Sequence, residues 1–346
     1  MAGELVERDG FPKDDETFVR LAYRYLLQRD VDPEGLEHYV GKLAGGAERQ
    51  AVIRDFVESS EFDAIANRRS VQPAIVSSLD YSGQLAEKAQ ADLRSASLEL
   101  TPADCEFYHT MELPDGEVHR GAWDLRNRET AYLGGIELDH ARVLELGPAS
   151  GHLTFWMESQ GAKVVGFEAG FDRTVDVVPS LRKDSEGFRR SIARTVQRVN
   201  NSWWYSHSRL SSSSTMVYGD IYCLPPDLGE FDVAIFGSIL LHLERPLRAL
   251  AAAAERSKTL VVCEPLGPFA ATADEKLMRP LPASDRNLTG WWQIAPGALV
   301  DMLEILGFGD FELTSHRQRH HVEHDVSSEQ VDVDMYTLVA RKNTDQ

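Results

Sequence analysis

Cysteine is scarce in this sequence. The 346 residues include three cysteines, Cys105, Cys223 and Cys263, which are odd in number and far apart in the chain. This arrangement provides neither a disulfide framework nor the paired spacing of a zinc knuckle. Because Cys263 ends the apolar run Thr259–Cys263, we expect it to be a small buried core residue.

Long apolar runs are also missing. No run reaches the roughly 18 residues that a membrane-spanning helix needs. The segment MAGELVERDGFPKDD contains no apolar stretch of the kind found in secretion signals. We therefore expect a protein of the reducing cytoplasm that does not bind membranes.

Basic residues are outnumbered by acidic ones. The chain has 36 Lys and Arg against 55 Asp and Glu, which gives a formal net charge of −19. This charge favours solubility and opposes broad electrostatic capture of nucleic acid or of an anionic membrane. The segment Arg182–Arg198 is a candidate for a local basic patch, but the charge of the whole chain works against it.

The most informative stretch is ARVLELGPASGHLT, residues 141–154. An apolar run breaks into a glycine-bounded turn and resumes with helical spacing, which predicts a buried strand, a turn and a helix. Gly147 permits backbone conformations closed to other residues, and Gly151 lets the helix approach a ligand without an intervening Cβ. Glu168 ends the next apolar run, where a carboxylate is placed to accept hydrogen bonds from a ribose. These features predict a nucleoside-containing cofactor.

The spacing of this turn excludes two common nucleotide sites. A dinucleotide fold needs G-x-G-x-x-G and a phosphate loop needs G-x-x-x-x-G-K-[ST], whereas the turn is E-x-G-x-x-x-G with a proline and no lysine. It resembles motif I of the class I S-adenosylmethionine-dependent methyltransferases. The resemblance continues through Glu168, Gly219–Ile221 and Phe231–Ser238, and covers roughly residues 106–346. The alternative is an α/β domain whose glycine turn is only a turn.

The resemblance implies S-adenosylmethionine as the cofactor. It places Glu145 and Gly147 at the amino-acid end of the cofactor, Glu168 at the ribose, and Asp220 beside the adenine. The cofactor-binding residues expected on this basis are Glu145, Gly147, Pro148, Gly151, Glu168, Asp220, Ile221 and Ser238. In related methyltransferases a lead-in segment, here YHTMELPDGEVHRGAWDLR, lies across the mouth of the cofactor site.

The pattern downstream of residue 106 alternates between strand and helix. It predicts a Rossmann-like α/β fold, with a seven-stranded methyltransferase sheet and helices on both faces. Strands are expected at 142–146, 163–168, 215–219, 231–236, 259–264, 309–315 and 332–341. We expect the last two strands to form an antiparallel hairpin across the polar turn Gln318–Gln330.

The N-terminal part has a different pattern. Apolar residues at helical spacing predict a small all-α domain in residues 1–75, followed by a linker, 76–105, and the catalytic domain, 106–346. The stretch FVRLAYRYLLQRDVDPEGLEHYVGKLAGG, closing with FVESSEF, resembles a helical domain of unknown function found beside bacterial polysaccharide-modifying enzymes. The resemblance implies an interaction module, for which a protein partner is the expected ligand, or a substrate-presenting module, and in either case no chemistry.

Four residues of this module fit the first half of a calcium loop, namely Asp30, Asp32, Glu34 and Gly35. The twelfth position, however, is Gly41, which cannot supply the bidentate carboxylate. We therefore expect a helix–turn–helix corner capped by acidic side chains.

Two side chains are candidates for catalysis. His242 follows the fourth strand, and imidazole titrates near neutral pH, which suits a general base for a hydroxyl acceptor. Alternatively, His242 binds the cofactor or caps a helix. Glu264 ends the fifth strand and is the second candidate; alternatively, it pairs with Arg245 or Arg248.

Aromatic clusters are the candidates for acceptor binding. Paired tryptophans in loops near a cleft suit stacking on a sugar, although core packing explains such pairs as well. The expected substrate residues are Trp123, Trp203, Trp204, His207, Trp291 and Trp292.

The run HRQRHHVEH invites a metal interpretation. Its histidines are His316, His320, His321 and His324. They fall on a strand end and its exposed turn, with no fixed helical spacing and an interleaved arginine, so we expect a solvated turn and no metal.

These observations lead to one favoured function and three alternatives. The favoured one is O-methylation of a hydroxyl on a saccharide, glycan or glycosylated small molecule, with the helical module docking a polysaccharide-assembly partner. N- or C-methylation of a secondary metabolite comes next. The enzymes that carboxymethylate wobble uridine in tRNA have basic and aromatic residues before motif I, where this chain offers only Arg120 and Trp123. A non-catalytic cofactor-binding scaffold is the last alternative.

Overall fold

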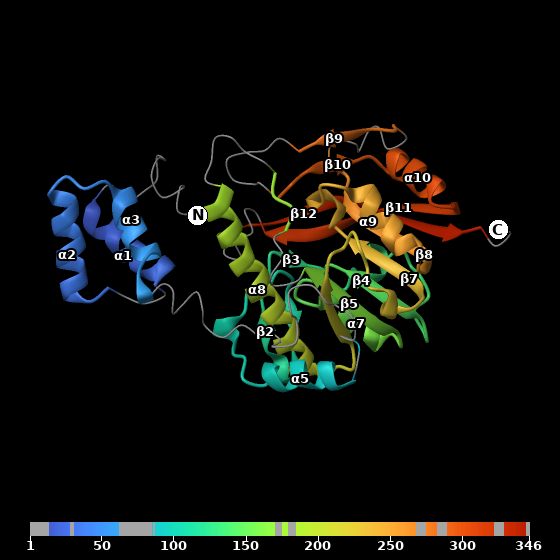
Figure 1. Cartoon of the computed structure of the whole chain (residues 1–346), viewed down its shortest axis with the longest axis horizontal. Helices are drawn as coiled ribbons and strands as arrows, with labels where there is room; N and C mark the ends of the chain where they lie inside the picture. The colour runs from blue at the N-terminus through green and yellow to red at the C-terminus, as the bar shows by residue number, and fades with distance from the viewer. Residues whose placement is uncertain are drawn as a thin grey trace. The chain divides into compact units, whose positions relative to one another are not determined.

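The computed structural model divides the chain into two compact units, Met1–Arg69 and Ser70–Gln346. Figure 1 shows the elements of each. The structure describes residues 14–27, 31–61, 85, 87–169, 175–178, 185–267, 275–281, 289–321 and 329–343.

The first unit contains three described helices. They are α1 (Asp15–Leu26), α2 (Pro33–Ala44) and α3 (Arg49–Val57). Phe18 and Phe56 are fully buried between them, as the helical spacing of the apolar residues predicts. The Asp32 carboxylate accepts a hydrogen bond from the Gly35 backbone N–H at 2.8 Å and caps α2. The acid-capped corner is confirmed; Asp30 lies outside the described residues.

The second unit is built on one mixed sheet, with strand order β3-β11-β12-β8-β7-β4-β5-β6. Its strands are β3 (Trp123–Asp124), β4 (Arg142–Leu146), β5 (Lys163–Ala169), β6 (Thr215–Gly219), β7 (Phe231–Gly237), β8 (Ser257–Pro265), β11 (Phe308–His321) and β12 (Gln330–Lys342). The strands β4 to β8 are parallel, and β12 is antiparallel to both of its neighbours. The seven predicted strands are confirmed, and the short β3 extends the sheet by an eighth.

Helices cover both faces of this sheet. The described helices of the unit are α5 (Glu87–Ser97), α6 (Glu129–Tyr132), α7 (His152–Ser159), α8 (Ser185–Leu210), α9 (Pro246–Ala254) and α10 (Pro296–Ile305). The smaller elements are β1 (Met111–Glu112), β2 (Val118–His119), β9 (Met278–Pro280), β10 (Trp292–Ile294) and the 3-10 turns η1 (Pro102–Asp104), η2 (Pro114–Gly116), η3 (Pro226–Leu228) and η4 (Leu240–His242). No described helix combines the length and the apolarity that crossing a membrane requires.

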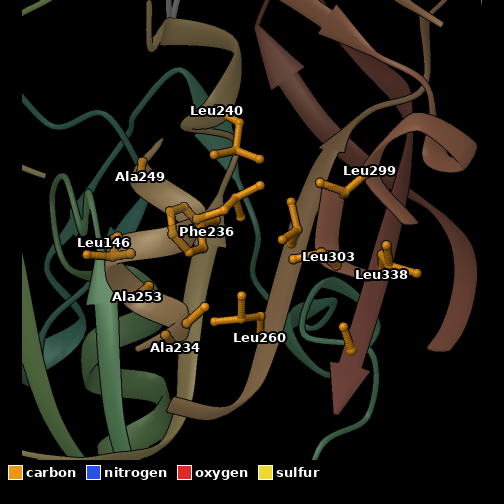
Figure 2. Close-up of a cluster of buried hydrophobic side chains, with 14 of the residues drawn as sticks. Leu146, Ala234, Phe236, Leu240, Ala249, Ala253, Leu260, Leu299, Leu303 and Leu338 are labelled. Carbon is orange, nitrogen blue, oxygen red and sulfur yellow. The ribbon is translucent and has the colours of Figure 1, made fainter. Parts of the chain in front are cut away.

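Strand β7 shows how the two layers form. Successive side chains point to opposite faces, so Val233 and Ile235 pack with α6 and α7. Ala234 and Phe236 pack with α9 and α10 (Figure 2). A strand buried on both faces has an almost continuous apolar sequence, as the run at 231–236 has.

The predicted linker at 76–105 is wrong for its second half. Helix α5 lies in this range, and its residues Ala89 and Leu93 are buried. The side-chain amide of Gln90 donates to the carbonyl of Met216 in β6 at 2.8 Å. The second unit therefore begins before residue 106. The buried side chains of Ala89, Gln90 and Leu93 are sufficient to dock this otherwise polar helix.

The predicted turn at Gln318–Gln330 is shorter than expected. Strand β11 continues to His321, whose register partner is Gln330. Arg319 forms an ion pair with Asp124 at 3.7 Å, and Arg317 one with Asp334 at 2.8 Å. Cross-strand ion pairs thus let a polar segment continue the sheet.

This longer strand also corrects the placement of the histidine run. His316 lies on β11, in keeping with the expected strand end. His320 and His321 also lie on β11 and not on the exposed turn, while His324 lies outside the described residues. The His316 Nε2 lies 3.0 Å from the Thr337 hydroxyl, and burial lowers the pKa of His316 to about 4. In the described part of the chain, no group of histidine, cysteine and acidic residues forms a metal site.

Candidate active site

A cavity of about 640 Å³ lies at the carboxyl ends of β4, β5, β6 and β7. The chain order reverses at β4, whose neighbours are β5 and β7. Open α/β sheets bind their ligands at such a switch point. Of the eight residues expected to bind cofactor, five line this cavity: Gly147, Glu168, Asp220, Ile221 and Ser238.

The glycine turn after β4 forms one wall of the cavity. Gly147 has φ +72°, and a Cβ there would collide with the side chain of Ile239. Ala149, which also lines the cavity, has φ +50°. Two left-handed residues, one on each side of Pro148, therefore fold the turn tightly and bring its backbone to the cavity.

Two other residues of the turn serve the packing. Gly151 has φ +87°, and a Cβ there would lie 2.6 Å from the Trp203 ring and 2.5 Å from that of Phe155. Pro148 packs over Gly166 of β5. Neither Gly151 nor Pro148 lines the cavity. The demand for glycine at 151 therefore comes from helix packing and not, as we expected, from approach to a ligand.

The lead-in segment reaches the cavity through the buried Ser150. Its Oγ accepts hydrogen bonds from the backbone N–H groups of Tyr108 at 2.6 Å and His109 at 3.2 Å. Both residues line the cavity. The indole of Trp123, an expected substrate residue, donates to the Tyr108 hydroxyl at 3.2 Å and is itself outside the wall. Trp123 thus supports a lining residue.

Acidic side chains follow two neighbouring strands. Glu168 near the end of β5 and Asp220 after β6 both line the cavity. Burial raises the pKa of Glu168, and its carboxylate accepts a hydrogen bond from the Ala169 N–H at 2.8 Å. Asp220 accepts one from the Tyr222 N–H at 3.0 Å. Their positions match those expected for ribose and adenine contacts.

Glu145, by contrast, is not part of the cavity wall. It is buried in β4, where its carboxylate accepts a hydrogen bond from the Thr154 hydroxyl of α7. Burial raises the pKa of Glu145 to about 7. The side chain therefore joins strand to helix, beneath the site where we expected it to meet the cofactor.

His242 ends the turn η4, which follows β7. Its Nδ1 lies 3.0 Å from the backbone carbonyl of Thr289, and both residues line the cavity. A carbonyl only accepts hydrogen bonds, so neutral His242 carries its proton on Nδ1 and its lone pair on Nε2. This tautomer suits a proton acceptor.

Glu264 at the end of β8 is buried and does not line the cavity. Its Oε1 accepts a hydrogen bond from the Leu240 N–H at 2.8 Å, at the start of η4. Burial raises the pKa of Glu264 to about 8. In the described structure neither Arg245 nor Arg248 pairs with it. Glu264 therefore holds the turn that carries His242.

The first tryptophan pair is part of the core. Trp203 and Trp204 lie in α8, not in a loop as predicted, and both are fully buried. The indole of Trp204 donates to the Tyr218 hydroxyl at 2.7 Å, and the Nε2 of His207 lies 3.0 Å from the Ser214 carbonyl. None of the three predicted residues lines the cavity, because they face the sheet below it.

The second pair lies beside η4. The Trp291 N–H donates to the Leu241 carbonyl at 2.8 Å, and the Trp292 indole donates to the Glu244 carbonyl at 3.1 Å. Trp292 belongs to the short strand β10, so this pair too is not in a plain loop. Both side chains are half-buried and outside the cavity wall, where they support the η4 region.

One face of α8 belongs to the site and was not predicted from the sequence. Residues at helical spacing line the cavity, namely Ile192, Thr195, Val196, Val199 and Asn200. The spacing was available in the sequence, but the helix is polar overall and its apolar strip is short. Asn200 and His109 are also buried, and the Asn200 amide and the His109 Nδ1 have no hydrogen-bond partner among the described residues.

The family of the second unit follows from its match to a known family model. A model described as "Methyltransferase domain" matches residues 119–308, more than half of the chain. The chain belongs to the class I S-adenosylmethionine-dependent methyltransferases. A second model, a domain of unknown function, matches residues 3–65 of this methyltransferase. No curated protein matches the chain.

Solved structures similar to the methyltransferase include two described with S-adenosylhomocysteine. One is the N-terminal domain of EvdMO1, with 17% identity, 73% of this chain and 97% of that chain covered, and a TM-score of 0.41. The other is 1,6-didemethyltoxoflavin-N1-methyltransferase from Burkholderia thailandensis, with 16% identity, 63% and 77% covered, and a TM-score of 0.38. Similarity at this level bears on neither acceptor nor mechanism.

The residues of the cavity fit S-adenosylmethionine, the cofactor of this methyltransferase. Glu168 would hold its ribose and Asp220 its adenine. The turn at Gly147 would let the methionine part of the cofactor come close to the protein backbone. Unpartnered polar atoms of Asn200 and His109 in the wall are available to hydrogen-bond a polar ligand. When bound, the cofactor supplies an electrophilic methyl group on a sulfonium.

Proposed function

We propose that this methyltransferase O-methylates a hydroxyl of a saccharide or a glycosylated small molecule, with His242 as the general base. The carrying observation is the hydrogen bond between His242 Nδ1 and the Thr289 carbonyl, 3.0 Å long, in the wall of the cavity. It leaves the lone pair of neutral His242 on Nε2, which accepts the proton of the acceptor hydroxyl. Holding the acceptor in line for displacement supplies much of the remaining acceleration.

The size and lining of the cavity support a small acceptor. Pockets for small molecules are typically 300–1,000 Å³, and this one is about 640 Å³. The α8 wall offers Ile192 and Val196 to the apolar face of a ring, with Thr195 beside them for a hydroxyl. Asp176 also lines the cavity, and its Oδ2 accepts hydrogen bonds from the Tyr222 hydroxyl and the Glu244 N–H, so its carboxylate is held in place beside the acceptor.

The setting and the partner are parts of the same proposal. We place the reaction in the cytoplasm, which the three free cysteines support. The helical module at residues 3–65 would dock a protein of polysaccharide assembly, in keeping with a separate compact unit that is not needed to complete the sheet. A tRNA acceptor is disfavoured by the net charge of −19.

The test is transfer of labelled methyl from S-adenosylmethionine into host extract, separated into polysaccharide, small-molecule, tRNA and protein pools. We expect label in the saccharide or small-molecule pool, held as an ether that resists mild base. Label on nitrogen or carbon, or in tRNA, contradicts the proposal. No label in any pool, with cofactor binding intact, points to a cofactor-binding scaffold.

A further inference from the structure

Two buried polar side chains of the cavity wall have unused hydrogen-bonding capacity. Asn200 is 1% exposed and His109 is 9% exposed, and both line the cavity. The side-chain oxygen and nitrogen of Asn200 have no hydrogen-bond partner among the described residues, and the same is true of the Nδ1 of His109. Buried polar groups in proteins are almost always paired, so these atoms indicate a ligand that pairs with them.

The stretch from Cys105 to His109, which ends in the lead-in segment, joins α8 to the glycine turn. The Glu106 N–H donates to the carbonyl of Arg198 in α8 at 3.0 Å, and the Arg198 guanidinium donates to the Cys105 carbonyl at 2.6 Å. Two residues further on, the Tyr108 N–H donates to Ser150 in the glycine turn. This stretch therefore spans from the part of α8 that carries Asn200 to the turn after β4.

The position of Asn200 along α8 places it near the glycine turn. Asn200 lies about one helical turn before Trp203. A Cβ at Gly151 would lie 2.6 Å from the Trp203 ring, so this part of α8 packs against the turn after β4. Asn200 lines the cavity from this part of the helix.

Few charged groups among the described lining residues could serve the amino-acid end of the cofactor. Arg245 is the single arginine or lysine among them, and its guanidinium stacks on the Tyr222 ring, 4.2 Å from the ring centroid. The Glu145 carboxylate is bound to Thr154 and lies outside the wall. The uncharged side chains of Asn200 and His109 are therefore candidates to meet an ammonium and a carboxylate at this end.

We infer that Asn200 and His109 bind the amino-acid end of S-adenosylmethionine. The amide of Asn200 offers an oxygen to the ammonium and an N–H pair to the carboxylate, and the imidazole of His109 offers one further donor. Burial lowers the pKa of His109 to about 3, so the ring is neutral at pH 7. The inference rests on the cofactor and is independent of the acceptor and of His242.

The experiment compares two ligands by calorimetry on the full chain. S-adenosylhomocysteine contains the amino-acid end, whereas 5′-methylthioadenosine has the same adenosine and thioether without it. We expect Asn200→Leu to weaken S-adenosylhomocysteine about 10- to 100-fold and 5′-methylthioadenosine less than about twofold, because one or two hydrogen bonds to charged groups are lost. His109→Phe gives the same selective loss.

Two further variants protect the result from a folding artefact. Ser206→Ala removes another buried, unpartnered polar group of α8 that lies outside the cavity wall, and it should leave both affinities unchanged. Asn200→Asp keeps the size of the side chain and places a carboxylate against that of the ligand, so it too should weaken S-adenosylhomocysteine alone. Equal losses for the two ligands overturn the inference, and so does unchanged cofactor affinity with a raised KM for the acceptor.

Discussion

The carboxylate of Glu264 is linked to His242 through the backbone of a single turn. Its Oε1 accepts the Leu240 N–H at 2.8 Å, and Leu240 begins the 3-10 turn that ends at His242. The buried carboxyl group on β8 thus fixes the position of the His242 imidazole in the cavity wall without contacting the imidazole. Glu264 acts as a positioning residue.

Replacing Glu264 should affect turnover more than cofactor binding. Glu264→Gln retains an oxygen for the Leu240 N–H, so we expect near-normal stability and a modest loss of kcat. Glu264→Ala leaves that N–H unpaired, which costs about 1–3 kcal/mol of unfolding free energy. It should also lower kcat at least about tenfold through misplaced His242. Denaturant unfolding and steady-state kinetics check both effects; equal kcat in all three proteins contradicts the role.

The buried Glu145 predicts a particular dependence of stability on pH. Burial raises the pKa of its carboxyl to about 7 from an ordinary value of 4.5, so the folded state binds its proton more tightly than the unfolded state does. The stabilisation is therefore complete below about pH 4.5 and is lost as the pH rises through 7. Glu145→Gln removes this loss. Relative to wild type, the variant should gain on the order of 2 kcal/mol between pH 5 and pH 8 by denaturant unfolding. A pH-independent difference contradicts the assignment.

Ser150 should couple the lead-in segment to cofactor affinity. Ser150→Ala leaves the Tyr108 and His109 N–H groups without their acceptor, so we expect stability to fall by about 1–3 kcal/mol and S-adenosylhomocysteine to bind at least about fivefold more weakly. The matched control is Ser202→Ala, which removes one of the two acceptors of the Glu106 N–H, two residues before Tyr108, and leaves the Arg198 carbonyl as the other. It should lower stability without a comparable loss of affinity. Similar losses of affinity in the two variants would contradict a specific role in cofactor binding for the contact between Ser150 and the lead-in segment.

The glycine turn offers a matched pair of substitutions. Gly147 and Gly135 both have left-handed backbones, at φ +72° and +69°, but only Gly147 has a neighbour that a Cβ would strike. Gly135→Ala should cost about 1–2 kcal/mol of stability and leave cofactor binding intact. Gly147→Ala adds the collision with Ile239 inside the cavity and should weaken S-adenosylhomocysteine more than about tenfold. Calorimetry decides, and equal affinities in the two variants contradict this account of the turn.

The sequence predicted the parts of the fold whose signals are local. A β-branched run such as Val143–Leu146 is buried on both faces wherever it lies in a parallel sheet, so its position and that of the following turn could be stated in advance. The acidic residues at the ends of the predicted strands then indicated Glu168 and Asp220 as candidate cofactor-binding residues. Neither inference needed knowledge of distant contacts.

The remaining site depends on contacts between distant segments. Trp203 and Trp204 have the same local sequence whether α8 turns them toward a sugar or toward Phe155 and Tyr218, and only tertiary packing decides. Asn200 appears in the sequence as one polar residue in a polar helix, and only the tertiary structure shows that it is buried. The spacing of its neighbours on α8 was available in the sequence, but the apolar strip is too short to distinguish this face from a surface face.

The central claim is that His242 accepts a proton from a hydroxyl acceptor, and His242→Asn tests it most directly. The asparagine amide can still donate to the Thr289 carbonyl, but it has no basic nitrogen. Transfer of labelled methyl to the acceptor and calorimetric binding of S-adenosylhomocysteine should be measured side by side. We predict that kcat falls at least about 100-fold while cofactor affinity stays within about twofold of wild type. Retention of wild-type kcat would contradict the account, since the transfer would then need no base at this position.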